Sequence, residues 1–248
     1  MKALLKVVLY QPLFNLLAFL TWLIPGHNIG LAIIALTFLI RIALIPSSNK
    51  AIRAQKKIKD LNPQIEELKK KYPDKQEQAK QMMTFYKVNK INPLSSCLPL
   101  LIQLPILFIM YYVFRTGLTT DRYDELLYSF TPHVAMINTK FLWMDLLQSD
   151  KLYILPVLAG LMQFIQSRQM VPISTKSDKP KSDMQDIMQK QMLYILPFTT
   201  VLISLSLPSA LSLYWVASIL ITIIQQKIVM NNKGAKADVS VSVRQKNS

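Results

Sequence analysis

Arg41 is the residue of this sequence most able to do chemistry, because it stands inside the apolar stretch Gly30–Ser47, GLAIIALTFLIRIALIPS. A guanidinium stays protonated in proteins and presents five N–H donors. A stretch of about 18 residues approaches the length that crosses a bilayer as a helix. An arginine near the middle of such a helix costs about 3 kcal/mol on insertion scales. We therefore expect Arg41 to be hydrated or paired.

The apolar stretches that we interpret as membrane spans contain no Asp or Glu that could pair with Arg41. They carry neutral polar side chains instead, and Thr37 lies one helical turn before Arg41 on the same face. Small polar residues often serve helix packing. Beside an unpaired arginine, they favour a hydrated cavity that could receive negative charge from a substrate. The five predicted spans are about 28–47, 94–114, 152–167, 191–207 and 210–226. Their other neutral polar residues are Ser95, Ser96, Gln103, Gln163, Gln166, Thr199, Thr200, Ser204, Ser206, Ser212, Tyr214 and Ser218.

Composition favours an all-α polytopic membrane protein, because 51% of the 248 residues are hydrophobic and only 17% are charged. The net charge of +15 would suggest nucleic acid in a soluble protein. Here the basic residues lie between apolar stretches, so we expect no specific nucleic-acid partner. Cys97 is the single cysteine, and His27 and His133 are far apart. Metal-ligand clusters, a Ser/His/Asp set and a glycine-rich phosphate loop are not found in the sequence, so we expect no metal, no cofactor and no enzymatic activity.

Residues 3–24 are apolar but are interrupted by Lys6, Gln11, Pro12 and Asn15. A signal peptide, a first span and an amphipathic helix lying in the membrane interface are the three alternatives. The polar interruptions favour the interfacial helix, which we assign to a segment 1–26.

Residues 49–92 change character abruptly, with 12 Lys/Arg after a first span that we expect to end at Pro46. Apolar residues recur at helical spacing on both sides of a turn at Tyr72–Asp74, and Pro63 is expected to kink or restart the first helix. The pattern predicts a helical hairpin standing in water. It is compatible both with a solvated connector and with a surface for anionic lipid or partners. Its candidate contact residues are Lys56, Lys57, Lys59, Lys69, Lys70 and Lys71.

The distribution of basic residues predicts the orientation in the membrane. Segments 49–92, 168–190 and 227–248 carry 12, 5 and 5 Lys/Arg, whereas segment 115–151 on the other side carries 4. By the positive-inside rule, the hairpin and the C-terminus are cytoplasmic. Segment 168–190 is predicted to be flexible, and the basic tail 229–248 to be disordered.

Several dispersed motifs occur in order from about residue 10 to 228. Gly30–Pro46 surrounds the arginine, and Asn92-Pro93-Leu94 precedes Cys97-Leu98-Pro99-Leu100-Leu101-Ile102-Gln103-Leu104-Pro105-Ile106. The others are Gln11-Pro12-Leu13-Phe14, Tyr153-Ile154-Leu155-Pro156, Pro208-Ser209-Ala210-Leu211 and Thr222-Ile223-Ile224-Gln225-Gln226. Together they closely resemble the YidC/Oxa/Alb family of membrane protein insertases. The bacterial YidC branch without a large periplasmic domain fits best.

The resemblance implies an insertase core over 27–228, namely five transmembrane helices, an external interfacial helix, a cytoplasmic hairpin and a groove open to cytoplasm and lipid. It implies a protein of the bacterial plasma (inner) membrane that inserts and helps fold nascent membrane proteins. Membrane lipids, the ribosome and the Sec translocon are the other expected partners. Arg41 and Thr37 match groove positions of the family, and we expect Gln103, Gln163, Ser204 and Ser212 to line the same groove. Positions along which nascent chains slide are matched by Cys97, Leu98, Pro99, Leu101 and Tyr214.

Two other functions compete on the residues alone. An anion channel or carrier would use Arg41 to bind small anions, and would need a pore open to both faces. A structural subunit of a membrane assembly is the third alternative. Neither of these two functions requires the motifs described above to occur together in that order.

Overall fold

The computed structural model describes residues 6–92, 98–117, 123–134, 136–170 and 190–231. Within these ranges the chain is mostly helical. The predicted flexible segment and basic tail therefore lie largely outside the described residues, as do Ser95, Ser96 and Cys97. The helices are η1 (Lys6–Tyr10), α2 (Gln11–Leu23), η2 (Pro25–His27), α3 (Ile29–Asp60), α4 (Asn62–Lys71), α5 (Lys75–Val88), α6 (Leu98–Tyr112), η4 (Val113–Gly117), α7 (Tyr123–Leu126), α8 (Ile154–Met170), η5 (Gln191–Ile195), α10 (Leu196–Leu205) and α11 (Ser209–Asn231). A small hairpin pairs β1 (Lys140–Phe141) with β2 (Met144–Asp145).

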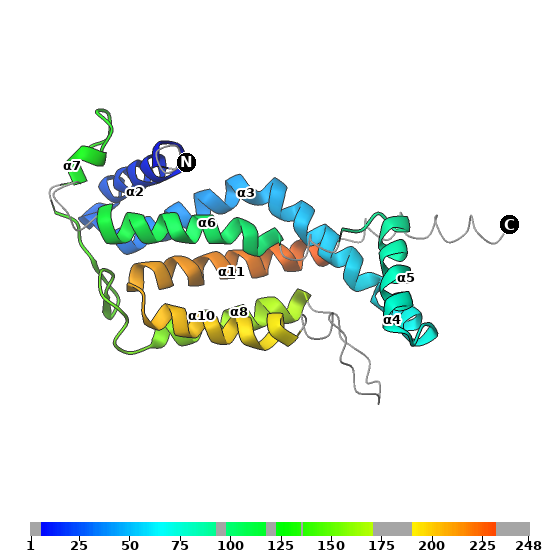
Figure 1. Cartoon of the computed structure of the whole chain (residues 1–248). Coiled ribbons are helices and arrows are strands. Elements are labelled where there is room, and N and C mark those ends of the chain that lie inside the picture. Colours follow the sequence, from blue (N-terminus) through cyan, green and yellow to red (C-terminus); the bar gives the residue numbers. More distant parts are fainter. Residues whose placement is uncertain (1–5, 93–97, 118–122, 135, 171–189, 232–248) are drawn as a thin grey trace.

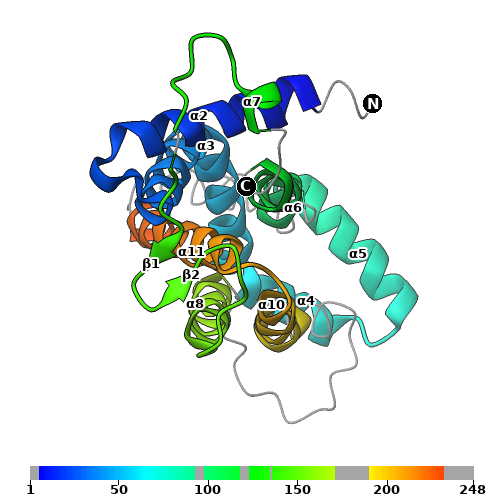
Figure 2. The same ribbon diagram turned by 90° about the vertical axis from the view of Figure 1, so that its left-hand side faces the viewer.

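The long helices run side by side, with α11 between α3 and α6 on one side and α8 and α10 on the other (Figures 1 and 2). Helix α2 lies across the bundle at the end where the β1–β2 hairpin is found, and α4 and α5 extend from the opposite end. Both α3 and α11 have the length and hydropathy to cross a membrane. Three further apolar helices, Val7–Leu23, Gln103–Arg115 and Gln191–Leu205, are shorter.

Helix α3 does not end at Pro46, as the sequence predicted, but continues through this proline to Asp60. Asn28 is its N-cap, and the Asn28 side chain accepts hydrogen bonds from the backbone N–H groups of Gly30 (3.0 Å) and Leu31 (3.2 Å). A proline inside a helix removes one backbone hydrogen bond and favours a bend, and Figure 1 shows α3 changing direction along its length. Ala51 and Ile52 are buried beyond the proline, so packing holds the helix together there.

The two helices that follow α3 restart where the sequence predicts. Leu61 separates α3 from α4, and Pro63 stands in the first turn of α4, where a missing N–H costs no helical hydrogen bond. Helix α4 ends before Tyr72, and Asp74 caps α5 by accepting a hydrogen bond from the Glu77 backbone N–H at 3.0 Å. The two helices pack against each other.

Asn15 fastens α2 to the segment after α7. Its side-chain amide donates to the backbone carbonyl of Leu126 at 2.9 Å. Its oxygen accepts from the Tyr128 backbone N–H at 2.7 Å and from the Thr131 hydroxyl at 2.8 Å. Only 5% of Asn15 is exposed. A polar residue that the sequence showed as an interruption of an apolar helix is therefore a fully bonded contact between distant segments.

Segment 138–150 ties together the N-terminal ends of three helices. The backbone N–H groups of Ile29 (3.1 Å), at the start of α3, and Ala210 (2.9 Å), at the start of α11, donate to carbonyls of this segment. The Asp150 carboxylate accepts from the Leu155 N–H at 2.8 Å near the start of α8. Gly30 admits the Phe141 ring, since a Cβ at Gly30 would lie 2.4 Å from two ring atoms. The free N–H groups of helix ends thus find partners in one loop.

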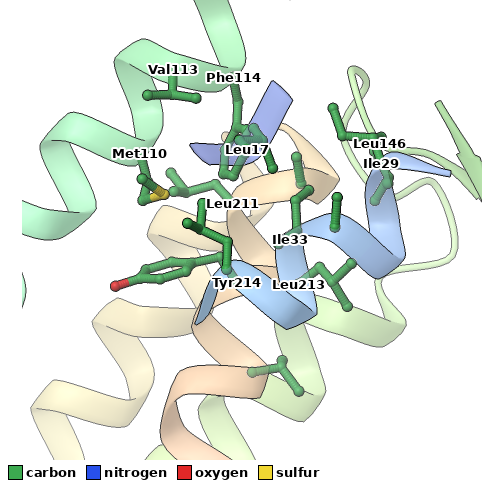
Figure 3. Packing of buried hydrophobic residues seen from close by; sticks show 14 of the residues in the cluster. Leu17, Ile29, Ile33, Met110, Val113, Phe114, Leu146, Leu211, Leu213 and Tyr214 are labelled. Atoms are coloured by element: carbon green, nitrogen blue, oxygen red, sulfur yellow. The ribbon is translucent and has the colours of Figure 1, made fainter. Parts of the chain in front are cut away.

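The apolar core forms where α2, α3, α6 and α11 meet, and Figure 3 shows side chains from all four helices in contact. Leu17, Ile33, Met110 and Leu211 are each almost completely buried there. On the other side of α11, Gly160 lets α8 approach α10, because a Cβ would lie 2.3 Å from a methyl carbon of Val201.

We predict that Asn15→Ala lowers the free energy of unfolding by about 2 kcal/mol, because it leaves the Tyr128 N–H and the Thr131 hydroxyl without their partner and the Leu126 carbonyl with only the longer bond from Gln11. Thermal unfolding in detergent micelles, followed by far-UV circular dichroism, measures the loss. Asn89→Ala is the matched control, since the Asn89 side chain, directly after α5, makes only a local bond to the Phe85 carbonyl of that helix (2.9 Å). Equal stability losses in the two variants would contradict the role given to Asn15.

Candidate functional site around Arg41

Arg41 lies on α3 and is hydrogen-bonded to two other helices. Its Nε donates to the Ser218 hydroxyl of α11 at 2.9 Å, and its Nη2 also donates to that hydroxyl. Nη2 donates in addition to the Gln103 side-chain oxygen of α6 at 2.8 Å. The site is therefore built where α3, α6 and α11 meet, from residues 62 and 177 positions away from Arg41 in the chain.

The partners of Arg41 among the described residues are neutral. No carboxylate of the described chain lies at ion-pair distance from the guanidinium, and no acceptor for its Nη1 is found there. Nη1 carries two of the five N–H donors of an arginine. The positive charge of Arg41 is thus stabilised by the dipoles of Ser218 and Gln103, and the two N–H groups of Nη1 can donate to another acceptor.

Gln103 links Arg41 to Tyr214. Its side-chain oxygen accepts from Arg41, and its side-chain nitrogen donates to the Tyr214 hydroxyl at 3.1 Å. Tyr214 is 1% exposed, and Figure 3 shows its hydroxyl at the edge of the apolar cluster. Three of the predicted site residues, Arg41, Gln103 and Tyr214, therefore form one network.

The other residues predicted for the groove are not hydrogen-bonded to this network. Thr37 is fully buried, and its hydroxyl donates to the Ile33 carbonyl of its own helix at 2.6 Å. Ser204 of α10 and Ser212 of α11 share a buried hydroxyl–hydroxyl bond of 2.7 Å that joins the two helices. Gln163 lies on α8, half-buried, without a side-chain hydrogen bond to the part of the chain that is described.

Ser218 is the residue that sequence reasoning did not select, although it was among the neutral polar residues of the spans. The available signal was its spacing, because Ser218 follows Tyr214 by four residues and so lies on the same face of a helix. Ser218 is completely buried. A buried serine facing an arginine from another helix can be recognised only once the two helices are placed together.

The predicted sliding surface and basic hairpin are only partly within the described chain. Leu98, Pro99 and Leu101 belong to the first turn of α6, but their side chains are outside the described part of the structure. Cys97 is outside it as well. The lysines of the predicted hairpin divide between two helices. Lys56, Lys57 and Lys59 belong to the end of α3, where Lys59 donates to the Gln169 carbonyl of α8 at 2.9 Å. Lys56 is buried there, so its prediction as a surface contact residue is wrong. Lys69, Lys70 and Lys71 form the last turn of α4.

Comparison with known proteins now identifies the family. The family model described as "60Kd inner membrane protein" matches residues 20–236. The membrane protein insertase YidC of Fusobacterium nucleatum is 37% identical over 230 residues, which cover 92% of this chain and 98% of the relative. The membrane protein insertase MisCA of Bacillus subtilis is 33% identical, with 90% of this chain and 78% of the relative covered. YidC of Clostridium perfringens is 34% identical, with coverage of 90% and 87%. The chain belongs to this family of inner membrane insertases.

Membership of the insertase family confirms the resemblance drawn from the dispersed sequence motifs. The matched region, residues 20–236, contains Arg41, Gln103, Tyr214 and Ser218. The network described above therefore lies inside the part of the chain that defines the insertase family.

In this insertase-family chain, we predict that Gln103→Leu lowers the free energy of unfolding by about 2 kcal/mol, because Arg41 Nη2 and the Tyr214 hydroxyl each lose a partner in a low-dielectric setting. Thermal unfolding in detergent measures the change. Adding Tyr214→Phe should recover part of the loss, since one of the two stranded groups is then removed. Gln163→Leu is the matched control and should cost less. A cost for Gln163→Leu equal to that for Gln103→Leu would argue against the network.

Proposed function

We propose that this chain is a membrane protein insertase that inserts, and helps fold, nascent membrane proteins through a hydrated intramembrane groove containing Arg41. The observation that carries the proposal is the guanidinium itself, which has neutral partners on two helices and two Nη1 donors without an acceptor in the described chain. An acidic or carbonyl group of a passing polypeptide can accept from those donors. No covalent chemistry is involved.

In the proposed arrangement, five spans cross the inner membrane, α2 lies in the outer interface, and α4, α5 and the C-terminus are cytoplasmic. The positive-inside rule supports this orientation. The groove is lined by Arg41, Gln103 and Gln163. Thr37, Ser204 and Ser212 stabilise its walls, because their hydroxyls are bonded within or between helices. The proposed sliding surface lies along α6 and α11, at Cys97, Leu98, Pro99, Leu101 and Tyr214.

The proposed driving force is the transfer of an apolar segment from water into lipid, at about 25 cal/mol per Å² of apolar surface. The polar flank of the segment must be translocated, and a hydrated path beside Arg41 avoids most of its desolvation cost. A membrane potential adds about 2.3 kcal/mol per charge per 100 mV to the outward movement of an acidic flank. Binding at Arg41 is transient in this mechanism, because the flank leaves on the far side.

The first proposed partners contact the cytoplasmic end of the molecule. Nascent membrane proteins enter from the cytoplasmic side, where Lys70 and Lys71, which are exposed at the end of α4, face the ribosome and anionic lipid headgroups. The Sec translocon is a further proposed partner. No nucleotide or cofactor is part of the proposed cycle.

Reconstitution tests the proposal. We expect vesicles that contain only this protein to insert a short single-span substrate, with its flank protected from added protease. Protein-free vesicles are the control. Vesicles that conduct small anions but leave the substrate outside would overturn the insertase function in favour of an anion channel or carrier.

Arg41→Ala should impair insertion of a substrate with an acidic flank about tenfold more than that of the same substrate with a neutral flank, because a hydrogen bond to a charged group contributes about 1.5–3 kcal/mol. Protease protection in reconstituted vesicles measures both. Arg41→Lys should retain more activity, since it keeps the charge but loses the planar fork of donors.

The matched control for Arg41 is Arg168→Ala, which removes an exposed arginine at the end of α8. It should affect the two substrates equally. Equal insertion of both substrates by a folded Arg41→Ala protein would reduce Arg41 to an architectural role.

A further inference from the structure

The segment that follows α7 exposes large apolar side chains. We call residues 127–137 the α7 loop. It contains no Asp, Glu, Lys or Arg. Phe130 is 80% exposed and Met136 is 82% exposed, and the rings of Tyr128 and Phe130 stack at a centroid distance of 5.2 Å. An uncharged loop with such side chains is unfavourable in water, and exposed apolar groups of this kind mark contact surfaces.

The α7 loop is fixed on α2 rather than standing free. Asn15 of α2 binds the Tyr128 N–H and the Thr131 hydroxyl, which flank Phe130 on either side in the sequence. The Gln11 side chain of α2 also donates to the Leu126 carbonyl at 3.4 Å. The position of Phe130 relative to α2 is therefore determined by buried hydrogen bonds.

Helix α2 carries exposed aromatic residues of its own. Phe19 and Trp22 contact each other, with ring centroids 5.9 Å apart, and both are exposed. The loop after α7 reaches outward past α2 at the side of the bundle in both Figure 1 and Figure 2, instead of covering the end of the bundle. In a bundle that spans a membrane, this is the place of the lipid that surrounds the protein.

One polar side chain of the α7 loop, His133, packs on α7. Its ring lies 2.9 Å from the Asp124 carboxylate and its centroid lies 5.7 Å from that of the Tyr123 ring. Phe130 and Met136, three residues to either side of His133, are 80% and 82% exposed instead. Side chains with an apolar body beside polar neighbours are typical of the boundary between headgroups and acyl chains.

We propose that the α7 loop and α2 form one lipid-binding surface, with Phe130 and Met136 inserted at the headgroup–acyl boundary of the leaflet remote from α4 and α5. Asn15 joins the two parts, so the loop and the helix sit at one depth. The surface anchors the end of α2 against the bilayer and thereby holds α2 across the ends of α3 and α6. The proposal does not depend on insertase activity, but only on a bundle that spans the membrane.

Fluorescence quenching tests the proposal on the full chain. In a Cys97→Ser background, Phe130→Cys and Met136→Cys are labelled in separate proteins with an environment-sensitive fluorophore. The proteins are reconstituted into vesicles of phosphatidylcholine and phosphatidylglycerol. Spin-labelled phosphatidylcholine, with its nitroxide near the headgroup boundary, reports lipid contact, and iodide reports contact with water. Both replaced side chains are highly exposed, so labelling leaves the core intact.

The matched control is Ser149→Cys, an exposed position in the segment between β2 and α8. Phe19→Cys on α2 is the reference for lipid contact. We expect nitroxide quenching at positions 19, 130 and 136 to exceed that at 149 by about threefold, as for a surface that enters the lipid by 5–10 Å, with the order reversed for iodide. Iodide quenching at 130 and 136 as strong as at 149 would overturn the proposal, whether the loop is solvated or waits for a protein partner. Weak lipid quenching at position 19 would overturn it as well.

Discussion

An arginine held by neutral partners is the constraint around which the bundle is arranged. Arg41 cannot lose its charge, and a charge in an apolar bundle is stable only where dipoles replace water. Ser218 and Gln103 supply those dipoles from two other helices, so satisfying Arg41 also fixes how α3, α6 and α11 meet. A carboxylate in the same place would form a closed ion pair, which is costly to open. Neutral partners such as Ser218 and Gln103 leave the charge of Arg41 free to attract a further acceptor.

Helix α11 is the element on which the polar contacts of the interior converge. It bonds α3 through Ser218, α6 through Tyr214 and α10 through Ser212. Each contact is short-range and directional, whereas apolar side chains alone would let these helices slide past one another. In lipid, where apolar packing gives little net driving force between helices, such bonds and close approaches such as that at Gly160 select one arrangement.

The two ends of the molecule are held in different ways. At one end, segment 138–150 satisfies backbone groups at the starts of α3, α8 and α11, so the end is bound by short hydrogen bonds to a loop. At the other end, α3 extends as a basic helix into α4 and α5, which pack mainly on each other. The bundle is therefore bonded to a loop at the end where α3, α8 and α11 begin, and it carries basic residues at the end where α3 finishes.

The sequence by itself determined that the chain is a membrane protein and that its predicted spans offer Arg41 no carboxylate partner. It also determined the two basic helices, the turn between them at Tyr72–Asp74 and the helix start at Pro63. All of these depend on local composition or on spacing within one helix. Ordered motifs also determined the family, because their agreement along the chain needs no coordinates. The tertiary structure alone decided the partners. Ser218 lies 177 residues from Arg41, and Leu126, Tyr128 and Thr131 lie more than 110 residues from Asn15. No periodicity encodes which distant helix a polar side chain faces. Tertiary packing also explains why α3 does not end at Pro46. The one backbone hydrogen bond lost at the proline costs less than unpacking Ala51 and Ile52 from their neighbours.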